Sequence, residues 1–483
     1  MESTLSQGWR EPARPDWLRR RPTAHYYALA AVCVGAFMGQ LDASIVTIAF
    51  PTFQRAFHAS VESVTWVGLS YLVVLVSVVT AVGHLSDMVG RKLLYTYGFV
   101  VFIVGSGLCA VAPSLLSLDL FRVVQAIGAA MLQANSIAII ALVMPRELLG
   151  RGLGIQGAAQ ALGLALGPTV GGILLAAGGW RLLFFVNVPA GILGTVAAWL
   201  FVPRSRDLRS RSRFDWIGLG LFLPAVVALL VAVTFGAHWG WLSSRTVCLL
   251  LVAAAAAAAF VAWERRARAP MLDLALFRSI PFTIGIISGL LSYLMLFGTM
   301  FAVPYFLERA RGDSSGRAGL ILTVLPLVLG CVAPFSSRLG RRRGARPLTV
   351  GGMALSAGAL AILALSHPGG WALAGGLGVV GLGLGLFIPA NNTVIMSATP
   401  RAHTGTTGGL LNMTRGLGTA LGLSLTGLVF GHFAAHHNSV AGATSGFHSA
   451  LLFLAAIAAM AGLTAASPGR RHSPASLSSQ SIS

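Results

Sequence analysis

The stretch YYALAAVCVGAFMGQLDASIVTIAF, residues Tyr26–Phe50, decides the fold. It exceeds the roughly 20 residues that an α-helix needs to cross a bilayer, and its one acidic or basic side chain is Asp42. Backbone polar groups in lipid must be satisfied within the segment, so the run is expected to be a helix. It is too long for a secretory signal and lacks a convincing cleavage site. We therefore expect a first transmembrane span here.

Similar apolar runs recur along the chain of 483 residues, of which 55% are hydrophobic and 10% are charged. A soluble fold could not bury that much apolar surface, so we predict an all-α integral membrane protein. Fourteen spans are expected, at residues 26–50, 63–83, 93–112, 118–143, 152–178, 182–203, 215–236, 245–263, 281–304, 316–336, 347–366, 371–396, 404–432 and 446–466.

The net charge of +20 comes from short basic clusters between the apolar runs. Because these residues do not gather on one face or tail, we expect no nucleic-acid partner. If the N-terminus is cytoplasmic, most of the 34 Lys and Arg residues fall in cytoplasmic segments. This asymmetry follows the positive-inside rule and predicts a multi-pass protein of the cell (plasma or inner) membrane with both termini in the cytoplasm.

Two loops indicate a chain built from two halves. GHLSDMVGRK (Gly83–Lys92) follows the second span, and SRLGRRRGAR (Ser337–Arg346) follows the tenth. Repeated halves around a central site are typical of secondary transporters. The predicted divisions are a cytoplasmic tail (1–25), a six-helix bundle (26–203), two additional spans with cytoplasmic linkers (204–280), a second six-helix bundle (281–466) and a disordered cytoplasmic tail (467–483).

Five stretches in register resemble one transporter family. GHLSDMVGRK resembles the loop signature of the major facilitator superfamily, and LFRVVQAIGAA (Leu120–Ala130) resembles its fourth-span motif. GLALGPTVGG (Gly163–Gly172) resembles the fifth-span motif of its exporters. LDASIVTIAFP (Leu41–Pro51) and WRLLFFVNVP (Trp180–Pro189) resemble its fourteen-span drug/proton antiporter branch. The resemblance implies two six-helix bundles plus two central helices, and proton-driven drug export by alternating access.

The loop after span two is a candidate inner gate. Gly83 and Gly90 would allow a tight turn between spans two and three. Asp87 lies just before span three, where a carboxylate meets the positive end of a helix and can pair with Arg91. We expect this cluster to latch one state of a two-state switch. A plain loop cap is the alternative.

Span five carries glycines at every fourth position, at Gly163, Gly167 and Gly171. They form one smooth face that another helix can approach closely. Pro168 removes a backbone donor and can bend the helix. Ordinary packing of small residues explains the same spacing, and the antiporter role of this motif comes from the resemblance.

Polar side chains at helical spacing predict a central substrate cavity. In span four, Arg122, Gln125 and Gln133 share a face. Such a stripe should face the bundle interior or a wet cavity and not lipid. Spans one, four, five and thirteen are expected to line the cavity, and its further candidate residues are Gln156, Gln160, Asn391, Asn412 and Arg415.

Asp42 is the acidic residue that we place deep inside a span. Burial favours the protonated form of a carboxyl group and a nearby arginine favours the ionised form, so a balanced group can gain and lose a proton. Arg122 lies at similar depth and is the expected partner. We predict that Asp42 and Arg122 couple proton movement to transport. A fixed ion pair and a single helix-fixing hydrogen bond remain alternatives.

The expected function is proton-coupled export of small amphipathic molecules from the cytoplasm. We find no nucleophile–base pair or phosphate loop, so no enzyme is expected. His432 and His436 have a metal-binding spacing, but no nearby Cys or acid joins them, so no metal is predicted. We expect a monomer with no cofactor, driven by the proton gradient, whose partners are a small-molecule substrate, protons and lipid. The alternatives are a dedicated exporter of one metabolite or antibiotic, an uptake permease, and a transporter-like membrane sensor.

Overall fold

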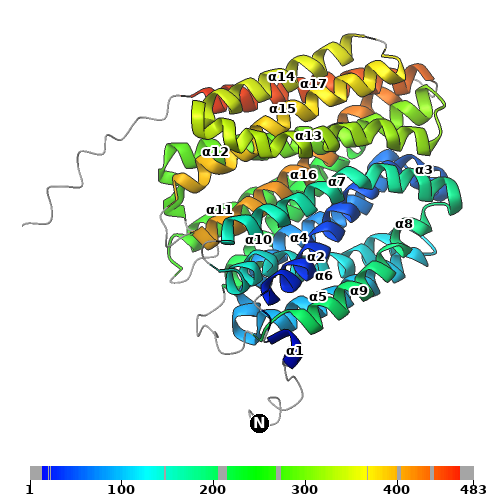
Figure 1. Cartoon of the computed structure of the whole chain (residues 1–483). Helices are drawn as coiled ribbons and strands as arrows, with labels where there is room; N and C mark the ends of the chain where they lie inside the picture. The colour runs from blue at the N-terminus through cyan, green and yellow to red at the C-terminus, as the bar shows by residue number, and fades with distance from the viewer. Residues whose placement is uncertain are drawn as a thin grey trace, which may run out of the picture.

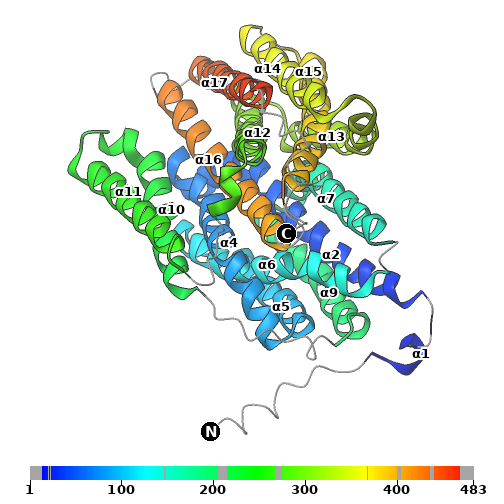
Figure 2. The same ribbon diagram turned by 90° about the vertical axis from the view of Figure 1, so that its left-hand side faces the viewer.

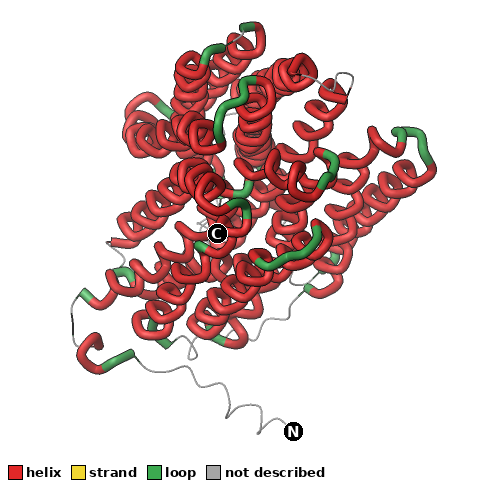
Figure 3. Tube along the Cα trace, turned by 90° about the vertical axis from the view of Figure 1, so that its right-hand side faces the viewer, coloured by secondary structure: helices red, strands yellow, loops and turns green. Residues whose placement is uncertain are grey.

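The computed structural model describes residues 14–19, 21, 23–145, 148–204, 215–267, 274–366, 368–399, 404–435 and 440–467. Throughout these ranges the regular structure is helical, without strands (Figure 3). Within the described residues, fourteen helices are long and apolar enough to cross a membrane, in agreement with the predicted number of spans. The structure is therefore that of a fourteen-span, all-α membrane protein.

The helices of the first half occupy the lower part of the molecule as drawn in Figure 1. They are α1 (Asp16–Arg19), α2 (Ala24–Ile45), the 3₁₀ turn η1 (Thr47–Ala49), α3 (Phe50–Phe57), α4 (Val61–Val89), α5 (Arg91–Ala110), α6 (Leu115–Val143), α7 (Leu149–Gly178), α8 (Arg181–Phe185) and α9 (Asn187–Phe201).

In the same view, α13, α14, α15 and α17 of the second half lie above them. Two further helices, α10 (Trp216–Trp239) and α11 (Ser244–Glu264), separate the halves in the sequence. The second half comprises η4 (Leu274–Arg278), α12 (Ile280–Tyr305), the π-helical turn η5 (Phe306–Ala310), α13 (Ser315–Arg343), α14 (Ala345–Leu365), α15 (Gly370–Ser397), α16 (Thr404–Ala435) and α17 (Val440–Ala466).

The first span is longer than the sequence predicts. It runs from Ala24 to Phe57, over 34 residues, because α3 continues the direction of α2 after a short 3₁₀ turn. Pro51 lies in the first turn of α3. Proline has no N–H and its ring crowds the carbonyl four residues earlier, here that of Thr47, so regular α geometry is interrupted there.

The glycine face of α7 packs against α2, as the close spacing of its glycines predicts. A Cβ atom at Gly167 would overlap the Ser44 hydroxyl, and one at Gly171 would lie 2.7 Å from the Cγ2 atom of Ile48. A Cβ at Gly163 would meet the carbonyl oxygen of Phe37. These glycines therefore set the distance between α7 and the helix that carries Asp42.

The two bundles meet along two helix pairs, α7 with α13 and α4 with α16. The Thr169 and Thr323 hydroxyls are 2.6 Å apart across the first pair, and a Cβ at Gly68 would lie 2.9 Å from Leu423 across the second. Near these contacts, Arg55 of α3 forms a 2.7 Å ion pair with Glu308 of η5. We call the region of these contacts the closed end.

The two helices that are central in the sequence lie at the edge of the structure. Figure 2 shows α10 and α11 beside α4 and α16, with α11 on the outside. The Thr234 hydroxyl of α10 is 2.6 Å from that of Ser424 on α16, and the Phe235 and Trp66 rings stack with centroids 6.1 Å apart. The α10–α11 hairpin thus packs on the outer side of the α4–α16 contact.

Candidate functional site

The Asp42 carboxylate lies at the centre of a fully buried polar network within the first bundle. Its Oδ2 atom accepts a 2.6 Å hydrogen bond from Nη1 of Arg122. Its Oδ1 atom accepts hydrogen bonds from Nε2 of Gln125 and from Nδ2 of Asn187, each 2.9 Å long. Asp42 is 0% exposed and Arg122 is 1% exposed. The expected contact between Asp42 and Arg122 is present, and their role in proton coupling stays a prediction.

The Arg122 guanidinium is held on several sides. Nε donates to the carbonyl of Val67 at 2.9 Å, and Nη1 also donates to Oε1 of Gln125 at 2.6 Å. Its Cζ atom lies 4.2 Å from the centroid of the Tyr71 ring and 5.7 Å from that of Phe184. Such a position over aromatic faces stabilises a cation that has been removed from water.

The network surrounds a buried charged pair with hydrogen-bond donors. Three donors stabilise ionised Asp42 without water. A proton on the carboxyl group cancels its charge and removes the main attraction for Arg122, and a buried guanidinium must then find other acceptors. These hydrogen bonds connect the three helices that carry the residues, namely α2, α6 and α9.

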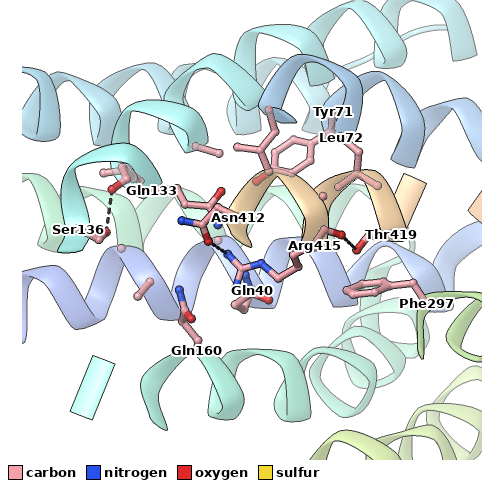
Figure 4. Close-up of a pocket in the computed structure, with 18 residues that line it drawn as sticks. Gln40, Tyr71, Leu72, Gln133, Ser136, Gln160, Phe297, Asn412, Arg415 and Thr419 are labelled. Atoms are coloured by element: carbon pink, nitrogen blue, oxygen red, sulfur yellow. Dashed lines mark hydrogen bonds between the residues drawn. The ribbon is translucent and has the colours of Figure 1, made fainter. Parts of the chain in front are cut away.

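A pocket lies between the two bundles, next to the network (Figure 4). Its walls come from both halves of the chain. They are Gly35, Ala36, Gly39, Gln40 and Ala43 of α2, Tyr71, Leu72 and Leu75 of α4, Ala129, Leu132, Gln133 and Ser136 of α6, Gln160 of α7, Phe297 of α12, and Asn412, Arg415, Gly416 and Thr419 of α16.

A second, smaller cavity lies between the pocket and Arg122. Arg122 lines it, together with Thr47 and Phe50. Tyr71 and Thr419 line both cavities. The Tyr71 side chain therefore separates the Arg122 guanidinium from the larger pocket while touching both.

The second bundle contributes the charged group of the pocket. Arg415 of α16 donates from Nη2 to Oδ1 of Asn412 at 2.8 Å, and its backbone carbonyl accepts from the Thr419 hydroxyl at 2.9 Å. Figure 4 shows the Arg415 and Asn412 side chains facing Gln40 of α2, with Gln160 of α7 below them. The predicted cavity positions Gln133, Gln160, Asn412 and Arg415 are thus brought together.

Three predicted cavity residues do not line this pocket. Gln125 belongs to the Asp42 network. Gln156 is buried on α7, one turn from Gln160. Asn391 is also buried, where it donates to the carbonyl of Gly285 at 2.9 Å and accepts from the Ser288 hydroxyl at 3.1 Å. Asn391 therefore fixes the packing of α15 on α12, a role that helical periodicity does not separate from cavity lining.

The candidate inner gate differs in part from its expected form. Gly83 does not lie in a turn, because α4 continues to Val89. Gly90 does form the turn, with a φ of 126° that favours glycine. Arg91 donates to the carbonyl of Ala138 at 3.4 Å. The Asp87 side chain lies outside the described part of the structure, so the Asp87–Arg91 latch stays a prediction.

Asn187 contacts Asp42 and Tyr71 contacts Arg122, but neither residue is among the site residues predicted from the sequence. Asn187 lies inside the quoted stretch WRLLFFVNVP, where a lone amide in an apolar segment was the available signal. Tyr71 gave no such signal, since an aromatic residue in an apolar span usually packs in the core. In the described residues no cluster of three His, Cys, Asp or Glu side chains could hold a metal ion, and His436 falls outside them.

The sequence matches the Major Facilitator Superfamily over residues 32–223 and 285–481. It is 34% identical over 403 residues to Multidrug resistance protein Stp of Mycobacterium tuberculosis, covering 83% of this chain and 75% of that protein. It is 32% identical to the Tetracenomycin C resistance and export protein of Streptomyces glaucescens, covering 85% of this chain and 76% of that protein. It is 30% identical to the riboflavin transporter RibZ of Clostridioides difficile, covering 87% of this chain and 92% of that protein.

The fold is similar to that of a solved transporter. The structure of a bacterial homologue of the human lysosomal transporter Spinster, in an inward-facing and unoccupied conformation, aligns with a TM-score of 0.70. The alignment covers 92% of this chain and 97% of that one. The sequence identity is 16%, so this likeness concerns the fold alone.

Proposed function

This chain belongs to the Major Facilitator Superfamily and is a multi-pass membrane transporter and not an enzyme, and from this we propose that it exports small amphipathic molecules in exchange for protons. Relatives named for multidrug resistance and for antibiotic export support the direction and the kind of cargo. We further propose that it acts in the inner membrane with both termini in the cytoplasm, as the arginine distribution suggests.

The observation that carries the proton coupling is the buried Asp42–Arg122 pair beside the pocket. A carboxylate that is 0% exposed inside a span is costly, and such residues mark ion and proton pathways in membrane proteins. Its three donors suit the ionised state. When Asp42 takes up a proton, Arg122 loses its counter-charge and the network rearranges.

One helix links the proton site to the pocket. On α2, Asp42 faces Arg122, while its neighbours Gln40 and Ala43 line the pocket. A rotation or bend of α2 therefore moves both sites together. The Tyr71 ring, which contacts Arg122 and lines the pocket, gives a second connection.

Alternating access would use the contacts between the bundles. If the start of α2 faces the cytoplasm, the closed end faces outward, and this conformation is sealed against the outside. Export requires the Arg55–Glu308 and Thr169–Thr323 contacts to separate while the other ends of the bundles approach. Breaking a few polar contacts is an appropriate scale for a rocking motion between two states.

The test uses everted membrane vesicles with an imposed pH gradient, acidic inside, and a panel of cationic, neutral and anionic amphiphiles. The wild-type protein should accumulate at least one compound, and Asp42→Asn should abolish accumulation while the protein remains folded in the membrane. Asp16→Asn, a carboxylate outside the spans, is the matched control. Normal gradient-driven accumulation by Asp42→Asn would overturn the assignment.

A dedicated exporter is the second candidate, because the relatives include proteins named for tetracenomycin C and for riboflavin. The breadth of the same panel separates the two functions. Accumulation of many unrelated compounds indicates multidrug export, and accumulation of one compound class indicates a dedicated transporter.

A further inference from the structure

The pocket between the bundles is electrostatically one-sided. Among its 18 lining residues, Arg415 carries the one full charge and no side chain is acidic. The carboxylate of Asp42 on α2 does not line the pocket. Its side chain is 0% exposed and is paired with Arg122. The pocket therefore presents a cation to whatever enters it.

Arg415 has a neutral partner only. Its guanidinium donates to the Asn412 amide oxygen, and none of its contacts in the described part of the chain is a salt bridge. Arg122, by contrast, has the Asp42 carboxyl group at 2.6 Å. The Arg415 side chain is partly exposed and lines the pocket, so its guanidinium is accessible to a bound anion.

The rest of the pocket suits a molecule with one polar end. Gln40, Gln133 and Gln160 line the same pocket and can each donate an amide hydrogen to an oxygen of a bound molecule. Leu72, Leu75, Leu132 and Phe297 form an apolar wall beside them. A few polar groups that fix orientation against an apolar lining are the usual composition of a ligand site.

We propose that this pocket selects amphipathic anions, whose carboxylate or similar acidic oxygen pairs with Arg415 while an aromatic or aliphatic body packs against Phe297 and the leucines. The inference deepens the export function proposed above, since it names the substrate class of the same pocket. An arginine is suited to a carboxylate because its planar fork of N–H donors matches two oxygens.

An electrical consequence follows from this charge. An anion that leaves the cell and protons that enter both move with an inside-negative potential. Export of an anion therefore carries one more charge per cycle than export of a neutral molecule of the same shape. An inside-negative membrane potential should therefore increase the export rate of the anion more than that of the neutral molecule.

The experiment compares three probes with the same ring system and different charge, namely 2-naphthoate, 2-naphthamide and (2-naphthyl)methylammonium. Binding to the purified protein in detergent is measured by calorimetry. The carboxylate should bind about 10-fold more tightly than the amide, and more tightly than the ammonium, because a hydrogen bond to a charged group contributes more than a neutral one. Arg415→Gln should remove this preference while binding of the amide persists, which shows that the pocket is intact.

Arg245→Gln, an exposed arginine on α11 far from the pocket in the sequence, is the matched control and should keep the preference. In proteoliposomes, an inside-negative potassium diffusion potential should speed efflux of 2-naphthoate more than that of 2-naphthamide. Equal or tighter binding of the ammonium or amide, no binding of the carboxylate, or an unchanged preference in Arg415→Gln would each overturn the anion site.

These outcomes are separate from the proton-coupling test. Binding in detergent needs no gradient. Gradient-driven export that fails in Asp42→Asn, together with no anion preference, overturns the substrate class alone. A clear anion preference without gradient-driven export leaves the anion site standing and removes the proton coupling.

Discussion

Tyr71 lies with its ring centroid 4.2 Å from the Cζ atom of Arg122, and the same side chain forms part of the pocket wall. The ring is thus in contact with the cation that holds Asp42 and with the space in which a substrate would bind. The Tyr71 side chain therefore connects the ion pair to the pocket.

Replacement of Tyr71 tests this connection. Tyr71→Phe keeps the ring face and should retain gradient-driven export. Tyr71→Ala removes a cation–π contact worth about 2 kcal/mol in a desolvated site and opens the wall between the cavities. We expect Tyr71→Ala to move fewer protons per substrate molecule, measured as paired proton and substrate fluxes in proteoliposomes. Equal coupling ratios in Tyr71→Ala and the wild type would contradict the connection.

Asn187 should matter more to stability than another buried asparagine. Asn187→Leu removes a donor to the Asp42 carboxylate and should cost about 1.5–3 kcal/mol, since the bond is to a charged group. Asn135→Leu is the comparison, because Asn135 donates to the Met131 carbonyl within its own helix and its Oδ1 atom is buried without a partner. The thermal unfolding temperature in detergent should fall further for Asn187→Leu. A larger fall in unfolding temperature for Asn135→Leu than for Asn187→Leu would contradict this prediction.

The α2–α7 contact can be tested with two glycines of one helix. At Gly167 an added Cβ would overlap Ser44, whereas at Gly157 it would meet nothing within 4 Å. Gly167→Ala should destabilise the protein by about 1–3 kcal/mol through overpacking. Gly157→Ala should be neutral or stabilise it by up to about 1 kcal/mol, because alanine has the higher helix propensity. Thermal unfolding measures both, and Ser44→Gly should partly rescue Gly167→Ala.

The ion pair at the closed end should bias the equilibrium between conformations. The Glu308 side chain is 3% exposed and that of Arg55 is 63% exposed. Such a partly exposed pair contributes about 1 kcal/mol or less, so Glu308→Gln should raise the open population by up to about fivefold. Labelling of a cysteine at position 323, in a cysteine-free background, reports the opening. Labelling that is unchanged in Glu308→Gln would show that the pair does not hold this end closed.

A matched variant separates charge from packing in that test. Exchanging the two charges, with Arg55→Glu and Glu308→Arg together, restores an ion pair and should return labelling toward the wild-type rate. Arg311→Gln, which affects a pair within one loop of the second bundle, should leave the rate unchanged.

Composition and periodicity predict the membrane fold well, because a bilayer imposes one length and one secondary structure on each apolar run. The number of spans and the contact between Asp42 and Arg122 follow from this. The sequence does not predict which of Gln156 and Gln160 lines the pocket. Both lie on the same side of α7, and only the tilt of the helix and its neighbours decide which one faces the pocket. Asn391 illustrates the same limit, since an amide in a span serves equally for packing or for binding.

The extent of α4 could not be predicted for a different reason. A glycine in a loop-like motif indicates a turn, but Gly83 tolerates helix when the flanking residues continue it. Only Gly90, with its positive φ, ends the helix.

The hydrogen-bond network around Asp42 and the charged group of the pocket, Arg415, lie on different halves of the chain. Asp42, Arg122, Gln125 and Asn187 all belong to helices before residue 202, whereas Arg415 lies on α16. Substitution of Arg415 on α16 would therefore change the charge of the pocket without replacing a hydrogen-bonding partner of Asp42. If Arg415 selects the cargo and Asp42 carries the proton, then cargo and coupling can be changed independently by substitutions in different halves of the chain.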